Sequence, residues 1–277
     1  MANVCVITGG GSGMGLAAAR FIDKETILVL TGRTVAKLEN AKAALEAEGH
    51  EVHPFACDVS SRRDVHELCL FASGLGTIRT VIHSAGLSPA MADPEQIIRV
   101  NAVGTKNVNM EFFKYMNDGG VIVDIASSSA YQAPAMLVKH QIYEMAEYRE
   151  DDFVKYMVKE GNLAPGDYNK SGLAYTLSKN FVVWYAQKCA HEYAAKGIRV
   201  VSVSPGLIET DMGALEAKHA QDMIDASCAR RMGKPEELGF AIASIADERN
   251  GYLCGIDVLI DGGASTGKQF KKLKQTD

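Results

Sequence analysis

Residues 4–15 read VCVITGGGSGMG, and residues 16–19 continue with LAAA. Val, Ile and Thr fill most of the first five positions, as is typical of a buried strand, and the alanine-rich stretch favours a helix. The glycines between them let the backbone turn sharply and approach a ligand closely. A strand that passes through a glycine-rich turn into a helix predicts an anion site, because free N–H groups and the helix dipole attract negative charge.

The alternation of strand and helix continues along all 277 residues. Short segments rich in Val and Ile predict buried parallel strands at residues 4–8, 27–31, 51–56, 80–83, 121–126, 199–204 and 257–260. Apolar residues at helical spacing predict helices between them, for example at residues 16–22, 35–47, 94–116, 173–195 and 236–246. This pattern predicts one α/β domain over residues 1–264, a Rossmann-type, doubly wound parallel sheet of seven strands.

Composition and charge argue against several other classes of protein. The net charge of −5 disfavours a general nucleic-acid surface. No apolar stretch reaches the roughly 18 residues of a membrane span, and no signal peptide is expected before the first strand. The six cysteines are widely spaced, which fits free thiols in a reducing cytoplasm. No histidine pair has metal-ligand spacing, so no metal site is expected. Residues 265–277 are expected to form a basic, solvated tail.

Residues 131–170 interrupt the regular alternation. A loop of that length without structure is uncommon in a compact domain. Residues 138–148 and 151–160 are amphipathic, so we expect a helical insertion between the fifth strand and the next helix. The insertion carries many apolar side chains, including Met136, Tyr143, Phe153 and Met157. We expect a partner surface to cover them, either a substrate pocket or a subunit interface.

Two motifs in order carry a family resemblance. Residues 8–15 have the spacing T-G-x-x-x-G-x-G, and Tyr175 and Lys179 form a Y-x-x-x-K pair further along the chain. With both motifs, the chain resembles the short-chain dehydrogenase/reductase family over nearly its whole length, apart from the insertion and the tail. The related extended enzymes, which include sugar-nucleotide epimerases, would have glycine in place of Ser12. The resemblance implies an oxidoreductase that uses a nicotinamide dinucleotide.

Tyr175 and Lys179 are the residues expected to move a proton. Their spacing puts both on one face of a helix, one turn apart. A tyrosine hydroxyl has an ordinary pKa near 10, too high for a ready base at neutral pH. A nearby ammonium and a positive nicotinamide would lower the pKa of Tyr175 by favouring its phenolate.

The resemblance implies two further catalytic residues. Ser127, after the fifth strand, would donate a hydrogen bond to the developing alkoxide, with Ser128 as the alternative. Asn101 is unfavourable in mid-helix and would hold a proton-relay water, with a structural hydrogen bond as the alternative. About a dozen residues separate the serine from the tyrosine in the family, whereas here the whole insertion lies between them.

The end of the second strand predicts the choice of cofactor. Enzymes that use NAD place an acid there to bind the ribose hydroxyls, but residues 31–34 read TGRT. Arg33 would pair with the 2′-phosphate of NADP, so NADP is predicted and NAD is the alternative, unless Arg33 is only a solvated loop charge. The resemblance places Asp58 beside the adenine. After the fourth strand, residues 83–86 read HSAG where the family usually has Asn-Asn-Ala-Gly, which leaves no side-chain role assigned there.

The turn after the sixth strand resembles the family's contact with the nicotinamide carboxamide. The backbone of Ile208 and the hydroxyl of Thr210 would fix which face of the ring is presented. The full set of expected cofactor-binding residues is Thr8, Gly9, Gly11, Ser12, Gly13, Met14, Arg33, Asp58, Val59, Ala85, Gly86, Asn101, Tyr175, Lys179, Pro205, Gly206, Ile208 and Thr210.

The long segment between serine and tyrosine resembles the bacterial 3α-hydroxysteroid dehydrogenase/carbonyl reductase branch. Residues 85–89 (AGLSP) and 161–164 (GNLA) support this. It implies a ketone or secondary alcohol that is bulky and apolar, such as a hydroxysteroid. The alternatives are a 3-oxoacyl-carrier-protein reductase, a general carbonyl reductase, or a non-catalytic NADP-sensing protein. An acidic carrier protein would need a basic docking surface near the cleft. The region after the sixth strand is itself acidic at Glu209, Asp211 and Glu216, which argues against that alternative. We expect a cytoplasmic homo-oligomer, dimer or tetramer.

Overall fold

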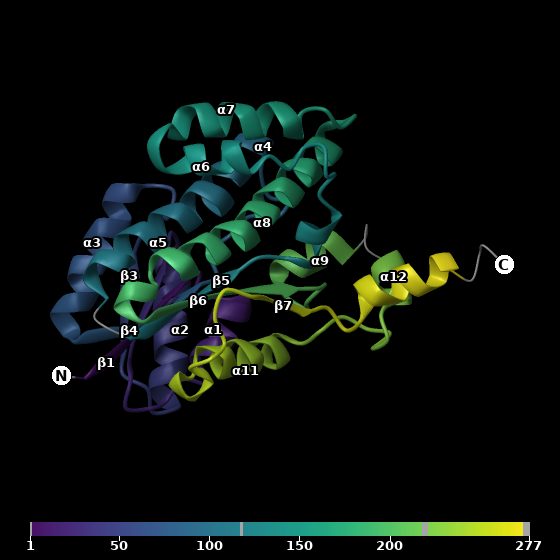
Figure 1. Ribbon diagram of the computed structural model, residues 1–277. Helices are drawn as coiled ribbons and strands as arrows, with labels where there is room; N and C mark the ends of the chain where they lie inside the picture. Colours follow the sequence, from purple (N-terminus) through teal and green to yellow (C-terminus); the bar gives the residue numbers. More distant parts are fainter. Residues whose placement is uncertain (1, 117–118, 218–220, 274–277) are drawn as a thin grey trace.

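Figure 1 shows the computed structural model, which describes residues 2–116, 119–217 and 221–273. Seven parallel strands form one sheet in the order β3-β2-β1-β4-β5-β6-β7. The strands are β1 (Asn3–Thr8), β2 (Ile27–Gly32), β3 (Val52–Ala56), β4 (Thr77–His83), β5 (Gly120–Ile125), β6 (Ile198–Pro205) and β7 (Asp257–Ile260). The predicted fold class is confirmed, and the one strand boundary that moves clearly is that of β4, which begins before the predicted residue 80.

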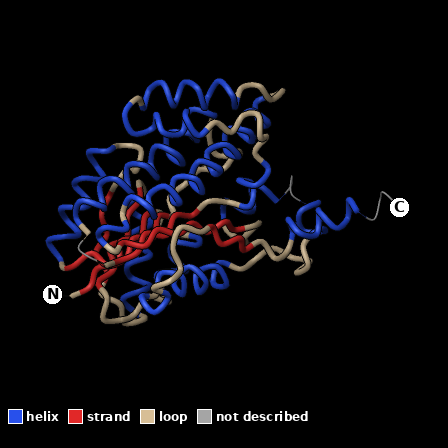
Figure 2. Tube along the Cα trace, viewed as in Figure 1, coloured by secondary structure: helices blue, strands red, loops and turns tan. Residues whose placement is uncertain are grey.

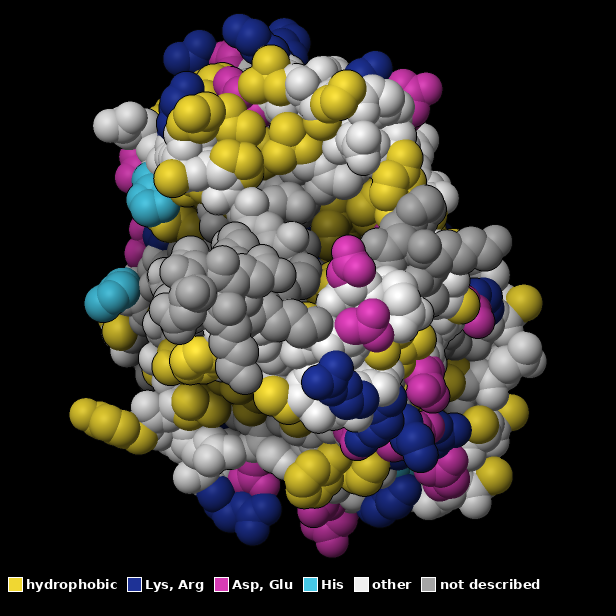
Figure 3. All heavy atoms as spheres, turned by 90° about the vertical axis from the view of Figure 1, so that its right-hand side faces the viewer, with side chains coloured by type: hydrophobic (Ala, Val, Ile, Leu, Met, Phe, Trp, Pro, Cys, Tyr) yellow, Lys and Arg dark blue, Asp and Glu magenta, His cyan; other side chains and the backbone are white. Residues whose placement is uncertain are grey.

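The order of the strands reverses between β1 and β4, because β2 and β3 extend the sheet one way and β5 to β7 extend it the other way. Ligands of such sheets bind outside the carboxyl ends of the strands at this point. Thr8 pairs with Thr31 of β2 and His83 of β4, so the three strands end at one level. The strands run from left to right in Figure 1, so their carboxyl ends lie towards the face shown in Figure 3.

Helices cover both faces of the sheet (Figures 1 and 2). One face carries α1 (Gly13–Ala19), α2 (Val35–Ala47) and α11 (Pro235–Ala246), and the other carries α3 (Arg62–Leu75), α5 (Gly104–Tyr115) and α8 (Asp167–Glu192). Side chains of a strand alternate between the faces. Val4 and Val6 therefore enter the core under α3, α5 and α8, whereas Cys5 and Ile7 enter the core under α1, α2 and α11. This explains why the strands are apolar at consecutive positions.

The insertion is helical, as predicted. A short 3₁₀ helix, η2 (Ser128–Gln132), follows β5, and α6 (His140–Tyr148) and α7 (Glu150–Gly161) then lie over α8 (Figure 1). The helix that follows the insertion is longer than predicted, because α8 begins at Asp167 and not at residue 173.

The prediction that a substrate pocket or a second subunit covers the insertion was wrong for three of its large side chains. Tyr143, Phe153 and Met157 are at most 1% exposed and belong to the core of this same chain. Tyr143 and Phe153 both pack against Phe181 of α8. Burial of each such side chain contributes about 1.5–3 kcal/mol, so docking on α8 accounts for this apolar content without a pocket or a second subunit. Other large side chains of the insertion stay exposed: Met136 is 80% exposed, and Tyr131, Tyr148 and Leu163 are each more than half exposed.

The predicted helix over residues 94–116 is interrupted. It consists of α4 (Pro94–Ile97), a π-helical turn η1 (Ile98–Val103) and α5. A π-helical turn is rare and is often found at functional sites, and this one contains Asn101.

The remaining elements are short and lie mostly after β6. They are η3 (Ala194–Lys196), α9 (Asp211–Ala217), α10 (Gln221–Ala226), η4 (Glu248–Asn250) and α12 (Ala264–Leu273). The predicted tail thus begins as helix α12, and residues 274–277 lie outside the described residues. Among the described residues, no helix is both long enough and apolar enough to cross a membrane.

Candidate active site

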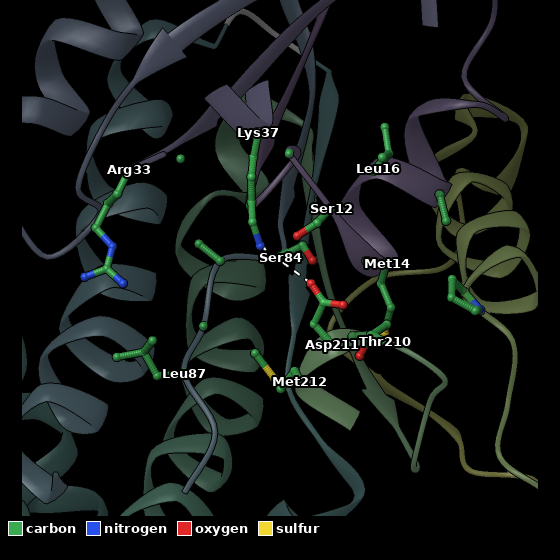
Figure 4. Close-up of a pocket in the computed structure, with 18 of the residues that line it drawn as sticks. Ser12, Met14, Leu16, Arg33, Lys37, Ser84, Leu87, Thr210, Asp211 and Met212 are labelled. Carbon is green, nitrogen blue, oxygen red and sulfur yellow. Dashed lines mark ion pairs between the residues drawn. The ribbon is translucent and has the colours of Figure 1, made fainter. Parts of the chain in front are cut away.

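A cavity of about 530 Å³ opens where β1 to β4 end. Its walls are the glycine-rich turn, the end of β2 and the segments that follow β3, β4 and β6 (Figure 4). The predicted cofactor-binding residues that line it are Gly9, Gly11, Ser12, Gly13, Met14, Arg33, Asp58, Val59, Ala85, Gly86 and Thr210. Gly206 and Ile208 instead line a smaller neighbouring cavity of about 170 Å³, and Pro205 is the last residue of β6. The structure thus brings eleven of the predicted residues around one space.

The glycine-rich turn has the shape that a dinucleotide needs. Gly9 and Gly13 have φ angles of +67° and +57°, which side chains rarely adopt. A Cβ atom on Gly9 would lie 2.9 Å from the backbone nitrogen of Ala85, and one on Gly15 would lie 2.7 Å from the carbonyl oxygen of Gly9. These contacts require glycine and leave a wall of backbone against which a pyrophosphate can lie. The residues present therefore fit the predicted cofactor.

Two cations border the end of the cavity near β2. Arg33 was predicted, whereas Lys37, in the first turn of α2, was missed. Lys37 Nζ lies 3.6 Å from Asp211 Oδ2 of α9, so this ion pair joins two of the segments that line the cavity (Figure 4). Both side chains are more than half exposed, and such pairs contribute at most about 1 kcal/mol. A phosphate group can therefore replace Asp211 as the partner of Lys37 at little cost. Lys37 stands four residues after Arg33, and this spacing was the one sign in the sequence that could have pointed to it.

A chain of hydrogen bonds crosses the sheet under the cavity. His83 Nδ1 lies 2.8 Å from Thr8 Oγ1, and His83 Nε2 lies 3.1 Å from Thr105 Oγ1. The Thr105 hydroxyl donates its one hydrogen to the carbonyl oxygen of Asn101, so it accepts from Nε2–H. Nδ1 then accepts from the Thr8 hydroxyl, which itself accepts from the N–H of Ala85. The chain joins the cofactor loops to the π-helical turn.

His83 is held neutral in this chain. It is only 2% exposed, and burial followed by the charge of Lys179 lowers its pKa to about 3. A neutral ring has one donor and one acceptor, which is what the two threonines require. Sequence reasoning assigned no side-chain role here, and the structure gives His83 a structural one.

Asn101 is buried and its side chain is fully engaged. Its Nδ2 donates to the carbonyl of Leu87 and to Ser178 Oγ, and its Oδ1 accepts from the N–H of Leu87 at 2.8 Å. This arrangement favours the structural hydrogen bond for the side chain. That Asn101 holds a proton-relay water stays a prediction.

Ser127, Tyr175 and Lys179 meet where β5 ends. Tyr175 is half-buried on α8, and Ser127 lies close enough to its hydroxyl to lower the pKa of the phenol by hydrogen bonding. Lys179 Nζ lies 5.8 Å from the centre of the Tyr175 ring and donates to the carbonyl of Ile125 at 2.7 Å. Ser128 is buried at 2% exposure, so the geometry favours Ser127 over Ser128 for the substrate contact.

Burial shifts all three ionisable groups of this site. It raises the pKa of Tyr175, and the charge of Glu216 adds to the rise while the hydrogen bond from Ser127 opposes it. Burial lowers the pKa of Lys179 to about 8, against the attraction of Asp124. Burial raises the pKa of Asp124 to about 7, against its hydrogen bond from Asn109. Lys179 is not among the groups that shift the pKa of Tyr175 here, so the expected lowering by an ammonium and a bound nicotinamide stays a prediction, and the phenol is protonated at neutral pH.

Helix α9 lies over this site and is held by Glu216. Glu216 Oε1 accepts from the N–H of Ala90 after β4, and Oε2 accepts from the hydroxyl of Tyr168 at the start of α8. Sequence reasoning placed Glu216 in an acidic segment but did not find these contacts, since its partners are far away in the sequence. Within residues 2–116, 119–217 and 221–273, no group of three or more His, Cys, Asp or Glu side chains is placed to hold a metal ion.

Comparison with known proteins agrees with this architecture. A family model described as short chain dehydrogenase matches residues 3–142, and one described as enoyl-(acyl carrier protein) reductase matches residues 161–265. The residues between the two matches belong to the insertion.

Two curated relatives match almost end to end. A 3-oxoacyl-acyl-carrier-protein reductase, FabG, of Thermotoga maritima is 29% identical, with 94% of this chain and 96% of the relative covered. A 3beta-hydroxysteroid dehydrogenase 2 of Eggerthella lenta is 27% identical, with 94% of each covered. Among solved structures, a variant of actinorhodin polyketide ketoreductase with NADPH superposes with a TM-score of 0.76 at 21% identity, over 95% of this chain and 97% of that one.

Proposed function

Because this chain belongs to the short-chain dehydrogenase/reductase family, whose members use NAD(P), we propose that it interconverts a ketone and a secondary alcohol with NADP(H). The observation that carries the proposal is the contact between Ser127 and a protonated Tyr175, with Lys179 one turn along the same helix. This is a hydrogen-bond donor beside a proton donor, which a carbonyl oxygen requires when it becomes an alkoxide.

The residues have separate tasks in the reduction. NADPH, when bound in the cavity, would supply the hydride for the carbonyl carbon. Tyr175 donates its phenolic proton to the carbonyl oxygen, and Ser127 orients that oxygen by a hydrogen bond. Tyr175 must then recover a proton. Lys179, with a pKa of about 8, exchanges protons readily near neutral pH and is positioned to support that recovery.

Preference for NADP over NAD is part of the proposal. Arg33 and Lys37 border the cavity near the end of β2, where the adenosine ribose of a dinucleotide lies in such folds. Two cations there favour a 2′-phosphate. The ketoreductase of similar fold is described with NADPH, which supports the same choice.

A bulky, uncharged substrate such as a hydroxysteroid is the substrate class that we propose. Ser127, Tyr175 and Lys179 do not line the cavity itself, but its wall is apolar at Leu87, Met91 and Met212, and methionines adapt their shape to bulky ligands. A relative at 27% identity is named a 3beta-hydroxysteroid dehydrogenase.

A 3-oxoacyl-carrier-protein reductase is the second candidate, because the Thermotoga relative carries that name. Its acidic carrier would need a basic surface at the site. Acidic side chains lie near the centre of the face in Figure 3, and basic ones gather below them. Glu209, Asp211 and Glu216 all belong to the segment that borders the cleft, which disfavours an acidic partner. A non-catalytic NADP sensor is the third candidate and would not need Ser127, Tyr175 and Lys179 in contact.

A substrate screen tests the proposal. Ketosteroids, small ketones and 3-oxoacyl thioesters are each offered with NADPH and with NADH, and consumption of the reduced nicotinamide is followed by absorbance. We expect ketosteroids with NADPH to give the highest kcat/KM, and Tyr175→Phe to abolish that turnover. A higher kcat/KM for the thioesters would favour the reductase of acyl carriers, and NADPH binding without any turnover would favour a sensor.

We also propose a cytoplasmic homo-oligomer. The six cysteines are free thiols, which supports a reducing compartment. Tyr252, Ile256 and Leu259 are exposed on or beside β7, which is the edge strand of the sheet, and an apolar edge of this kind favours association. Light scattering gives the mass, and a monomer at micromolar concentration would contradict this proposal.

A further inference from the structure

The segment that carries Ser127 is held by two consecutive residues of α8. Lys179 Nζ donates to the carbonyl of Ile125 at 2.7 Å, and Asn180 Nδ2 donates to the carbonyl of Ala130 at 3.1 Å. These two carbonyls lie on either side of Ser127 in the sequence. The Ser127 hydroxyl also accepts from the N–H and the hydroxyl of Ser129 inside the same turn. The position of Ser127 relative to Tyr175 therefore depends on both bonds from α8.

The bond from Asn180 needs a third residue, and this residue comes from the insertion. Tyr143 of α6 donates its hydroxyl to Asn180 Oδ1 at 3.0 Å. An amide has a donor end and an acceptor end, so a donor on Oδ1 leaves Nδ2 directed at Ala130. Without Tyr143, the amide loses the contact that keeps its oxygen away from that carbonyl.

Tyr143 is rigid and remains a donor. Its ring is 1% exposed and contacts Phe181 at 5.3 Å and Trp184 at 5.5 Å between ring centres, both edge to face. Burial raises the pKa of its phenol, so the hydroxyl stays protonated over the range in which enzymes are assayed. Packing thus delivers the hydroxyl to Asn180 at a fixed place.

We propose that the insertion positions Ser127, through a relay in which Tyr143 orients Asn180 and Asn180 holds the carbonyl of Ala130. Neither Tyr143 nor Asn180 lines the cavity, so both are positioning residues. The inference rests on the proposed function, since it assigns the insertion a task in carbonyl reduction. In this relay the insertion acts on Ser127 through the backbone of η2, and not as a wall of the pocket or as a contact with another subunit.

Tyr143→Phe tests the relay, because it removes one hydroxyl and keeps the packed ring. A single hydrogen bond is worth about 0.5–1.5 kcal/mol, so we expect kcat to fall about three- to tenfold. The dissociation constant for NADPH should not change, since the cavity is formed by other elements. Tyr185→Phe is the matched control. Tyr185 of α8 is also fully buried and also forms a hydrogen bond between α6 and α8, but its partner is Glu147 Oε1 at 2.9 Å.

The pH profile separates positioning from a loss of stability. The hydrogen bond from Ser127 lowers the pKa of Tyr175, so a displaced serine lets that pKa rise. The rate of alcohol oxidation should then increase with pH through a higher apparent pKa in Tyr143→Phe than in wild type, with Tyr185→Phe unchanged. Asn180→Ala should shift the profile the same way. The double variant should be no slower than Asn180→Ala alone, because both residues act through one bond.

Hydrogen exchange tests the relay without any activity. The peptide that covers residues 125–132 should exchange about three- to tenfold faster in Tyr143→Phe and at the wild-type rate in Tyr185→Phe. Equal exchange in wild type and Tyr143→Phe, or equal kcat and pH profile in both, overturns the relay. If exchange accelerates as expected but wild type turns over none of the carbonyl compounds, the relay stands and the proposed function fails.

Discussion

His83 predicts a measurable dependence of stability on pH. Burial and the charge of Lys179 lower its pKa in the folded chain to about 3, whereas an exposed histidine has a pKa near 6.5. Between these two values the unfolded chain binds a proton that the folded chain does not. The free energy of unfolding therefore falls as the pH falls through this window. At pH 7 and above the contribution of His83 to this change vanishes.

The size of the effect follows from the two pKa values. One pKa unit corresponds to about 1.4 kcal/mol, and pH 5 lies about 1.5 units below the unfolded value. The titration of His83 should therefore lower the free energy of unfolding by about 2 kcal/mol when the pH falls from 7 to 5. Asp124 acts in the opposite direction, because its folded pKa is raised to about 7 and protonation then favours the folded chain. Comparison of variants that all retain Asp124 removes its contribution.

Urea unfolding of wild type, His83→Gln and His83→Leu at pH 7 and pH 5 measures the effect. Both variants lack the titrating ring, so each should lose about 2 kcal/mol less than wild type on acidification. Glutamine can still accept from Thr8 and donate to Thr105, whereas leucine leaves both buried hydroxyls without that partner, at about 1–3 kcal/mol each. His83→Leu should therefore be clearly the less stable variant at pH 7. If all three proteins lost equal stability between the two pH values, His83 would not be a buried neutral ring.

Three further predictions concern the reaction itself. Tyr175→Phe should lower kcat about 10²- to 10⁴-fold with NADPH binding intact, and steady-state rates within tenfold of wild type would remove Tyr175 from the mechanism. Arg33→Ala should reduce the ratio of kcat/KM for NADPH over NADH about ten- to hundredfold, and a wild type that prefers NADH would contradict the cofactor assignment. Ser127→Ala should lower kcat more than Ser128→Ala does, because Ser127 contacts the Tyr175 hydroxyl. The opposite order in single-turnover rates would transfer the role to Ser128.

The fold could be predicted because its signals are local. A parallel strand covered on both faces must be apolar at consecutive positions, and the core assignments of Val4 and Cys5 show this pattern in β1. The glycine-rich turn was readable for the same reason, since Gly9 and Gly15 are required by contacts with the nearest backbone. The π-helical turn at Ile98–Val103 was not predicted, because it adds one residue within a single turn and the segments on either side keep ordinary helical spacing.

The partners of buried groups could not be predicted, because they come together only in the fold. His83 interacts with Thr8 and Thr105, which are 75 and 22 residues away in the sequence. A histidine in a strand gives no sign of its tautomer or charge until those two hydroxyls are placed. The same holds for the partner of the apolar face of the insertion. Its spacing predicted that Tyr143 and Phe153 would be covered, but not that Phe181 would cover them.

The position of the insertion explains why it can be long without separating Ser127 from Tyr175. The bonds from Lys179 to Ile125 and from Asn180 to Ala130 lie before the chain departs towards α6. The serine is thus attached to α8 on the sheet side of the insertion. The insertion then folds back onto α8 and ends where α8 begins, so both of its ends are fixed on the helix that carries Tyr175. Extra residues here lengthen the chain between the two catalytic groups without increasing the distance across which they act.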